Sequence, residues 1–219
     1  MWAGILAGFV IGGIGGRLAM FVLRLTSDPR LDGVLTDDGF EIGRFSCDMF
    51  FLVLLCTVAG MVGGLFYLVI RGWLPAKGRP ALMALFGGAV GGAMIIRPEG
   101  IDFTELDPLS LAVGMFVALP ALYGLGMTWL AERWIAKTEE SKNYYPLVAF
   151  LPLLGLGLGG PIGALIGVIV VAGWFMNRGI VPIAKMWRST PVTLIGRLAF
   201  IGTIAFGLWV LGRDVASVL

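Results

Sequence analysis

The sequence predicts an all-α integral membrane protein with about seven transmembrane helices, and three observations support this fold class. Of the 219 residues, 58% are hydrophobic and only 14% are charged, which is far from the averages of soluble domains. The apolar residues gather in runs of about twenty, the length that an α-helix needs to cross a bilayer. Glycine recurs at every fourth position in two of these runs. We therefore expect one polytopic membrane domain that covers residues 1–219.

Two glycine ladders predict close packing between helices. The first consists of Gly4, Gly8, Gly12 and Gly16, and the second of Gly155, Gly159, Gly163 and Gly167. Small residues four apart lie on one face of a helix and allow a neighbouring backbone to approach closely. Helix packing is therefore the role that the sequence predicts for both sets of glycines.

The apolar runs define the predicted spans in order along the chain. The first run carries no charge before Arg17 and lacks the basic segment of a signal peptide, so we expect it to stay in the membrane. The second run contains Cys47 at its edge and Cys56 inside it, too far apart along a helix to bridge each other. The fourth contains Pro120, which predicts a kink. The first four spans and the final one cover residues 2–25, 48–70, 81–96, 109–130 and 193–212.

The apolar run over residues 146–176 is too long for one ordinary span. As a single helix it would extend about 46 Å, well beyond the hydrocarbon thickness of a bilayer of about 30 Å. Gly159-Gly160-Pro161 sits in its middle, and both residue types weaken a helix. We expect a hairpin of two short helices, 146–158 and 162–176, which gives seven helices. One long tilted helix is the alternative and gives six.

Charged residues in the loops predict the orientation. Ten of the 14 acidic residues lie in or beside two alternate loops, 27–46 and 97–108, which places both loops on one side of the membrane. The loop between the second and third spans holds Arg71, Lys77 and Arg79 without an acid, and basic loops favour the cytoplasm. We therefore expect the N-terminus in the cytoplasm, the acidic loops outside and, with seven helices, the C-terminus outside.

Three charged residues form the candidate polar or anion site: Arg17, Arg24 and Asp48. Arg17 lies deep in the first span, where a charge costs about 3 kcal/mol unless it is paired or reaches water. Asp48, at the outer start of the second span, is the nearest partner in sequence, and the pair could join the two helices or line a polar cavity. Arg24 follows Arg17 by two helical turns on roughly the same face. An anionic headgroup or substrate held between the two arginines is the alternative.

The sequence offers no recognisable catalytic, cofactor-binding or metal-binding residues. It contains no histidine, which is the commonest general base and a frequent ligand of zinc and of haem iron. The acidic loop 27–46 could gather a calcium ion, although its residues do not follow the order of an EF-hand. We predict no cofactor and no metal.

The glycines also suggest an internal repeat. The segment 12–16, with Ala19 and Met20 after it, resembles the segment 87–92, with Ala93 and Met94 after it. Each segment precedes an acidic outer loop, so the first four spans could be two parallel copies of a helical hairpin. A general bias towards glycine would give the same pattern.

A pattern of polar residues and glycines runs through the first fifty positions. It consists of Gly16-Arg17 with Met20, Arg24, Thr26 and Ser27, followed by Thr36-Asp37-Asp38-Gly39 and Ile42-Gly43. This pattern resembles uncharacterised bacterial multi-pass membrane proteins. The resemblance implies a bacterial plasma-membrane protein of similar topology, and it implies no activity.

The functional expectation follows from packing and from the missing chemistry. We expect a protein that is not an enzyme and that serves as a subunit or scaffold of a larger membrane complex. A small transporter or channel for an ion or anionic solute is the alternative, and a lipid-modifying enzyme ranks third. The expected partners are membrane lipids and other membrane-protein subunits or further copies of this chain, with no nucleic acid.

Overall fold

The computed structural model describes most of the helical part of the chain. The described residues are 1–27, 48–98, 100, 108–141, 151–152, 167, 186–187 and 189–218. Every described element is a helix, and four helices are long and apolar enough to cross a membrane. The predicted all-α membrane class is therefore confirmed for this part of the chain.

The helical segments follow one another as apolar spans joined by loops. The first span is continuous and consists of α1 (Trp2–Ala7), the π-helical segment η1 (Gly8–Gly15) and α2 (Gly16–Thr26). The second is α3 (Asp48–Ile70). A shorter apolar helix comprises α4 (Arg79–Phe86), the π-helical segment η3 (Gly87–Gly91) and α5 (Gly92–Ile95). The remaining long helices are α6 (Leu109–Ser141) and α11 (Thr190–Val218).

Two of these helices extend past the predicted spans. α6 continues beyond residue 130, and α11 continues beyond residue 212. Apolar runs mark only the part of a helix that lies in lipid, and a helix that leaves the bilayer can continue with polar residues. The predicted hairpin 146–158 and 162–176, with its break near residues 159–161, lies outside the described residues.

The first glycine ladder packs against α3 of the same chain. A Cβ atom added at Gly8 would lie 2.5 Å from the carbonyl oxygen of Cys56 and 2.9 Å from the Cα of Gly60, so only glycine fits. Gly4 meets the same Gly60 backbone, and Gly12 faces the Cys56 side chain. The first two spans are thus in direct backbone contact.

The remaining ladder positions behave differently. Gly16 has no described atom within 4 Å of the place where its Cβ would lie, so the contact face ends one turn before it. Gly155, Gly159 and Gly163 lie outside the described residues. Gly167 is described only as a half-buried helical residue.

The helix α4–η3–α5 packs against α6 in a similar way. A Cβ at Gly87 would collide with the carbonyl oxygen of Pro120, and one at Gly124 would collide with the carbonyl oxygen of Met83. The two glycine-rich segments that resemble each other in sequence both adopt the π-helical form, as η1 and η3. Each hairpin therefore pairs a glycine-rich helix containing a π-helical segment with a long α-helix.

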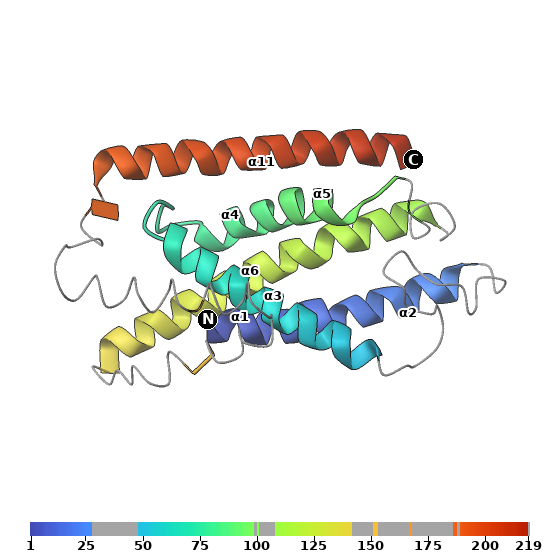
Figure 1. Ribbon diagram of the computed structural model, residues 1–219, viewed down its shortest axis with the longest axis horizontal. Helices are drawn as coiled ribbons and strands as arrows, with labels where there is room; N and C mark the ends of the chain where they lie inside the picture. Colours follow the sequence, from blue (N-terminus) through green and yellow to red (C-terminus); the bar gives the residue numbers. More distant parts are fainter. Residues whose placement is uncertain are drawn as a thin grey trace.

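Helix α6 joins the two hairpins, and α11 covers the outer side of the second (Figure 1). α6 contacts both α1 and α4, whereas α11 contacts α4, η3 and α5. Phe86 of α4 stacks between Phe66 of α3, with ring centroids 5.4 Å apart, and Phe200 of α11, at 5.2 Å. These rings connect three helices in one apolar core.

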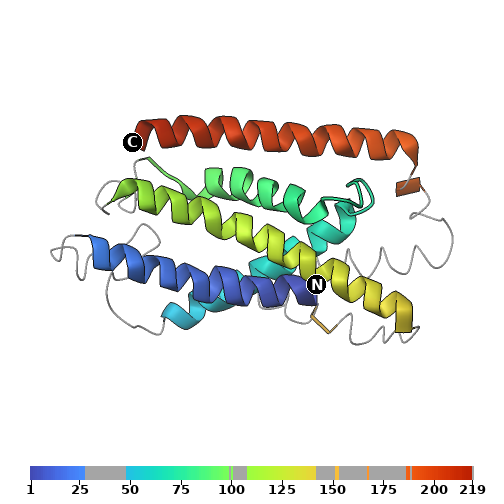
Figure 2. The same cartoon turned by 180° about the vertical axis from the view of Figure 1, so that it is seen from behind.

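The bundle has two ends, which we call the basic end, after Arg71, Lys77 and Arg79, and the cavity end, after the cavity described below. At the basic end α3 and α6 finish while α4 and α11 begin (Figure 1). At the cavity end α2, α5 and α11 finish while α6 begins, and the same arrangement is visible from behind in Figure 2. The C-terminal end of α11 therefore lies at the end of the bundle from which the two predicted acidic loops emerge.

Candidate functional site

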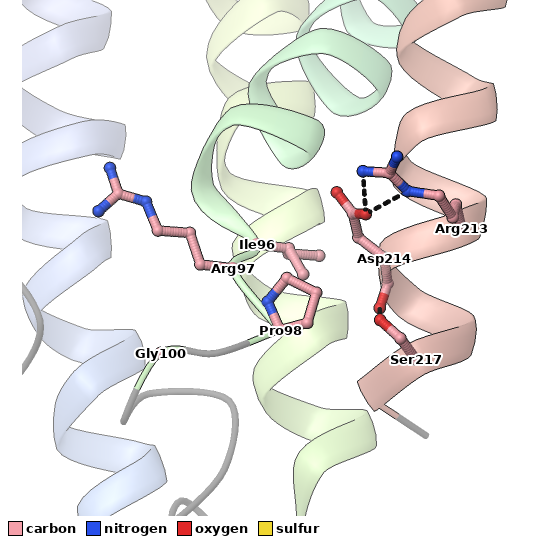
Figure 3. Close-up of a pocket in the computed structure, with 7 residues that line it drawn as sticks. All are labelled: Ile96, Arg97, Pro98, Gly100, Arg213, Asp214 and Ser217. Atoms are coloured by element: carbon pink, nitrogen blue, oxygen red, sulfur yellow. Dashed lines mark hydrogen bonds and ion pairs between the residues drawn. The ribbon is translucent and has the colours of Figure 1, made fainter.

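A cavity of about 770 Å³ opens where α5 and α11 finish. The turn after α5 contributes Ile96, Arg97, Pro98 and Gly100, and the last turns of α11 contribute Arg213, Asp214 and Ser217 (Figure 3). Ile96 is buried against the apolar side chains of α6 and α11, which fixes the turn in place. The cavity thus joins two segments that are far apart in the sequence.

Asp214 is the acidic group of this cavity and is only 7% exposed. Its Oδ1 accepts hydrogen bonds from the neighbouring Arg213, at 2.9 Å from Nε and 2.8 Å from Nη2. Ser217 donates its hydroxyl to the Asp214 backbone carbonyl at 2.7 Å. The Arg213 side chain is 63% exposed and also lies over the Trp209 ring, 5.6 Å from its centroid. The carboxylate is therefore held by a cation that water can also reach.

Arg97 lies on the opposite side of the cavity from Arg213. Its side chain is exposed and points away from the Arg213–Asp214 pair (Figure 3). Ile96 and Pro98 form apolar wall between the two arginines. A molecule with an apolar body and an acidic group would find both kinds of contact here, because guanidinium groups bind carboxylates and phosphates through paired hydrogen bonds.

The predicted site residues lie elsewhere on the cavity side of the bundle. Arg17 and Arg24 are half-buried on α2, and the Nε and Nη2 atoms of Arg17 are buried. Asp48 begins α3, but the placement of its side chain is outside what the structure describes, so the Arg17–Asp48 pair stays a prediction. Neither Arg17 nor Arg24 is among the described residues that line the cavity.

The basic end contains an ion-pair network, which we call the Glu132 cluster: Tyr67, Arg71, Arg79 and Glu132. Glu132 Oε1 accepts hydrogen bonds from the Tyr67 hydroxyl at 2.5 Å and from Arg71 Nε at 2.6 Å. Its Oε2 accepts from Arg71 Nη2 at 3.1 Å and from Arg79 Nη1 at 2.9 Å. The hydrogen bond to Glu132 raises the pKa of Arg71 further above its usual range. Both carboxylate oxygens are thus fully used, and α3, α4 and α6 are tied together.

The sequence contained a signal for one of the two acids, Asp214 and Glu132, that the predicted sites omitted. Asp214 continues the buried face of α11, where Phe200, Ile204, Gly207 and Leu211 precede it at helical spacing, so it is an acid in an apolar position. Glu132 lies just past the predicted end of its span, where an acid is ordinary, and carries no such signal. An acid that falls in register with an apolar face is the pattern that would have found Asp214.

No group of three or more His, Cys, Asp or Glu side chains gathers within the part of the chain that the structure describes. The described cavity instead offers two cations, one carboxylate and one hydroxyl. These groups can bind an acidic molecule and can exchange a proton with it.

Comparison with known proteins gives one weak relative. Heme A synthase from Erythrobacter litoralis (strain HTCC2594) is 27% identical over 186 residues, which cover 76% of this chain. The matched region covers 53% of that protein, so the chain spans about half the length of the curated relative it matches. No family model matches the sequence, and no solved structure matches it.

This similarity corrects two expectations. The relative is an enzyme by name, which contradicts the expectation that the chain is not an enzyme. It also contradicts the expected role as a non-catalytic subunit or scaffold, with a transporter or channel as the alternative. The first expectation rested on missing histidine and on missing acid and base pairs, and the second rested also on the glycine ladders. Absent motifs do not exclude a site assembled from ordinary arginine and aspartate residues, and close helix packing does not exclude catalysis.

Proposed function

We propose that this chain is a membrane-embedded enzyme that acts on a lipid-soluble molecule carrying an acidic group. The observation that carries the proposal is the similarity to Heme A synthase over three quarters of the chain. The cavity between α5 and α11 is the proposed substrate site. Its volume of about 770 Å³ falls in the range of about 300–1,000 Å³ that is usual for pockets binding small molecules.

The charged residues of the cavity suggest distinct roles. Arg213, whose guanidinium lies beside Asp214, binds the acidic group of the substrate, and Arg97, which points away from that pair, adds positive charge at the edge of the cavity. Asp214 is the candidate general acid or base, because it is the buried carboxylate of the cavity and reaches it from a rigid helix. The exposed apolar side chains near the cavity, Met94 on α5 and Phe206 and Trp209 on α11, favour entry of the substrate from lipid.

The proposal does not include a haem iron bound by histidine. The relative is named for making haem A, and histidine is the usual protein ligand of haem iron in many proteins. The sequence of 219 residues contains none. The proposed enzyme therefore recognises its substrate through acidic groups and an apolar body, and not through a histidine–iron bond.

A comparison of membrane extracts tests the proposal. The gene is deleted in its natural host and replaced with wild-type, Asp214→Asn or Arg133→Gln copies, and lipid-soluble molecules are compared by mass spectrometry. We expect at least one molecule to depend on the wild-type copy and to be lost with Asp214→Asn. Arg133→Gln is the control for the loss of a charged side chain elsewhere, because Arg133 stacks on Trp129 at 5.3 Å and lies at the basic end, away from the cavity.

Two results would contradict the proposal. Identical extracts from the deletion and wild-type strains would rule out the proposed enzymatic activity. A full effect of Arg133→Gln would show that the loss is unrelated to the cavity, provided that all variants reach the membrane in equal amounts.

The finer topology is part of the same proposal. It comprises seven helices, a cytoplasmic N-terminus and an external C-terminus in a bacterial plasma membrane. The sidedness rests on the basic and acidic loops of the sequence, and the described helix ends bear on the number of crossings. α6 finishes and α11 begins at the same end of the bundle, which is the outcome of an even number of crossings between them (Figure 1). Cysteines introduced at Asp38 and Lys185 test it: an impermeant thiol reagent added outside should label only the first.

A further inference from the structure

The Glu132 cluster carries more positive than negative charge. Two guanidinium groups, from Arg71 and Arg79, share the single carboxylate of Glu132. The Arg79 side chain is only 14% exposed and that of Arg71 26%, so the excess charge is poorly hydrated. An unbalanced charge in such a place is costly. An additional anion would remove that cost.

Hydrogen-bond donors near the cluster also lack acceptors. Arg79 Nε is buried and has no partner among the described residues. The same is true of Trp73 Nε1, in the turn that connects Arg71 to Arg79. A phosphate group supplies both the missing negative charge and several strong acceptor oxygens.

The cluster lies where phospholipid headgroups are found. α3 finishes at Ile70 and α4 begins at Arg79, which places the turn between them at the end of the apolar segments. Trp73 packs against Trp187 with ring centroids 4.9 Å apart, and paired aromatic rings at helix ends are typical of the membrane interface. Lys77 is exposed in the same turn and adds a further positive charge.

We propose that Arg71 and Arg79 bind the phosphate of an anionic phospholipid at the basic end of the bundle. Basic pockets between transmembrane helices bind such headgroups by the same chemistry. Glu132 holds the two guanidinium groups in position and limits the affinity, because its own charge opposes that of the phosphate. This site is independent of the cavity at the other end and of the proposed enzymatic role.

The test measures lipid binding to the full chain by native mass spectrometry after removal of endogenous lipid. Phosphatidylglycerol, phosphatidylcholine and inorganic phosphate are the probes, and the wild type is compared with Arg79→Gln, Glu132→Gln and Arg133→Gln. We expect the wild type to prefer phosphatidylglycerol, and Arg79→Gln to bind it roughly fivefold more weakly, the effect of one arginine at a membrane surface. Glu132→Gln should unfold at a lower temperature and yet bind phosphatidylglycerol at least as tightly as the wild type.

In Glu132→Gln the unfolding temperature should fall while the affinity for phosphatidylglycerol is kept or rises. This difference separates lipid binding from a purely structural role of the cluster. If Glu132→Gln loses phosphatidylglycerol along with stability, the cluster is structural and the proposal fails. If Arg133→Gln and Arg79→Gln weaken phosphatidylglycerol binding equally, diffuse surface charge explains the binding. If inorganic phosphate stabilises the protein as much as phosphatidylglycerol does, the ligand is a free anion. Both results also overturn the proposal. If Arg79→Gln does not fold, Arg79→Lys and Glu132→Gln carry the test.

Discussion

The two ends of the bundle use the same kinds of side chain for opposite purposes. At the basic end, Glu132 accepts hydrogen bonds from three residues on two other segments of the chain. At the cavity end, Asp214 receives its side-chain hydrogen bonds from its own neighbour, Arg213, and faces a cavity. The first acid joins helices, whereas the side-chain hydrogen bonds described for the second stay within α11, beside the cavity. A carboxylate with hydrogen-bond donors on both oxygens is therefore a structural feature. A carboxylate in a cavity with donors on only one oxygen is a candidate for catalysis.

The largest expected effect comes from the middle of the bundle, which holds both ends in place. Gly8→Leu should prevent α1 from packing on α3, because even the first side-chain carbon would lie 2.5 Å from the Cys56 carbonyl oxygen. We expect a loss of at least about 3 kcal/mol of stability or failure to fold, measured by thermal unfolding in detergent. Gly16→Leu is the control and should fold normally, since that position faces open space. A normal melting temperature for Gly8→Leu would contradict the backbone contact.

Next in size is the loss of the acid at the basic end. Glu132→Ala should reduce the free energy of unfolding by about 2 kcal/mol, because two poorly hydrated arginines lose their counter-charge. The expected loss of stability is smaller than that for a fully buried ion pair, because the Glu132 side chain is 28% exposed. Circular dichroism during heating measures the change. An unchanged unfolding temperature would make the cluster a surface feature.

A smaller effect should follow from a single hydroxyl. Tyr67→Phe removes one donor to the Glu132 carboxylate and should cost about 1.5 kcal/mol, since hydrogen bonds to charged groups are the stronger ones. Tyr123→Phe is the matched change: its hydroxyl donates to the neutral carbonyl of Gly60 at 2.6 Å and should cost about 1 kcal/mol. Unfolding temperatures of the two variants can be compared directly. The reverse order would argue against a charged Glu132.

The smallest change in stability should come from the acid at the cavity end. Asp214→Ala leaves Arg213 in contact with water, so we expect a loss of about 0.5 kcal/mol or less. The same variant should abolish whatever product depends on the cavity. A loss as large as that of Glu132→Ala, measured in the same unfolding experiment, would mean that both acids are structural and that the contrast between the ends is false.

The sequence predicted the membrane class because apolar length and composition depend on the bilayer and not on tertiary contacts. The ladder at Gly4, Gly8 and Gly12 marked a face that does lie against another helix, but spacing alone could not identify α3 as its partner. The cavity was beyond prediction for a different reason. Arg97 and Asp214 line one cavity only because α11 packs on α5, and such long-range packing leaves no local pattern that joins the two residues. Glu132 was missed because the polarity of its neighbours resembles that of an ordinary helix end.

Helix α11 contacts the rest of the bundle differently at its two ends: a hydrogen bond holds its start, and apolar packing holds its last turns. Near its start, Arg197 Nε donates a 2.6 Å hydrogen bond to the Trp73 carbonyl, and Gly196 lets the Trp73 ring lie flat against the helix. Towards the cavity its contacts with η3 and α5 are van der Waals contacts, such as that of Gly207 with Ala89. About 25 Å of helix separates Arg197 from Asp214, so a tilt of about 5° around the hydrogen-bonded end moves the carboxylate by about 2 Å. A change in the angle of α11 at its hydrogen-bonded start would therefore change the width of the cavity at its other end.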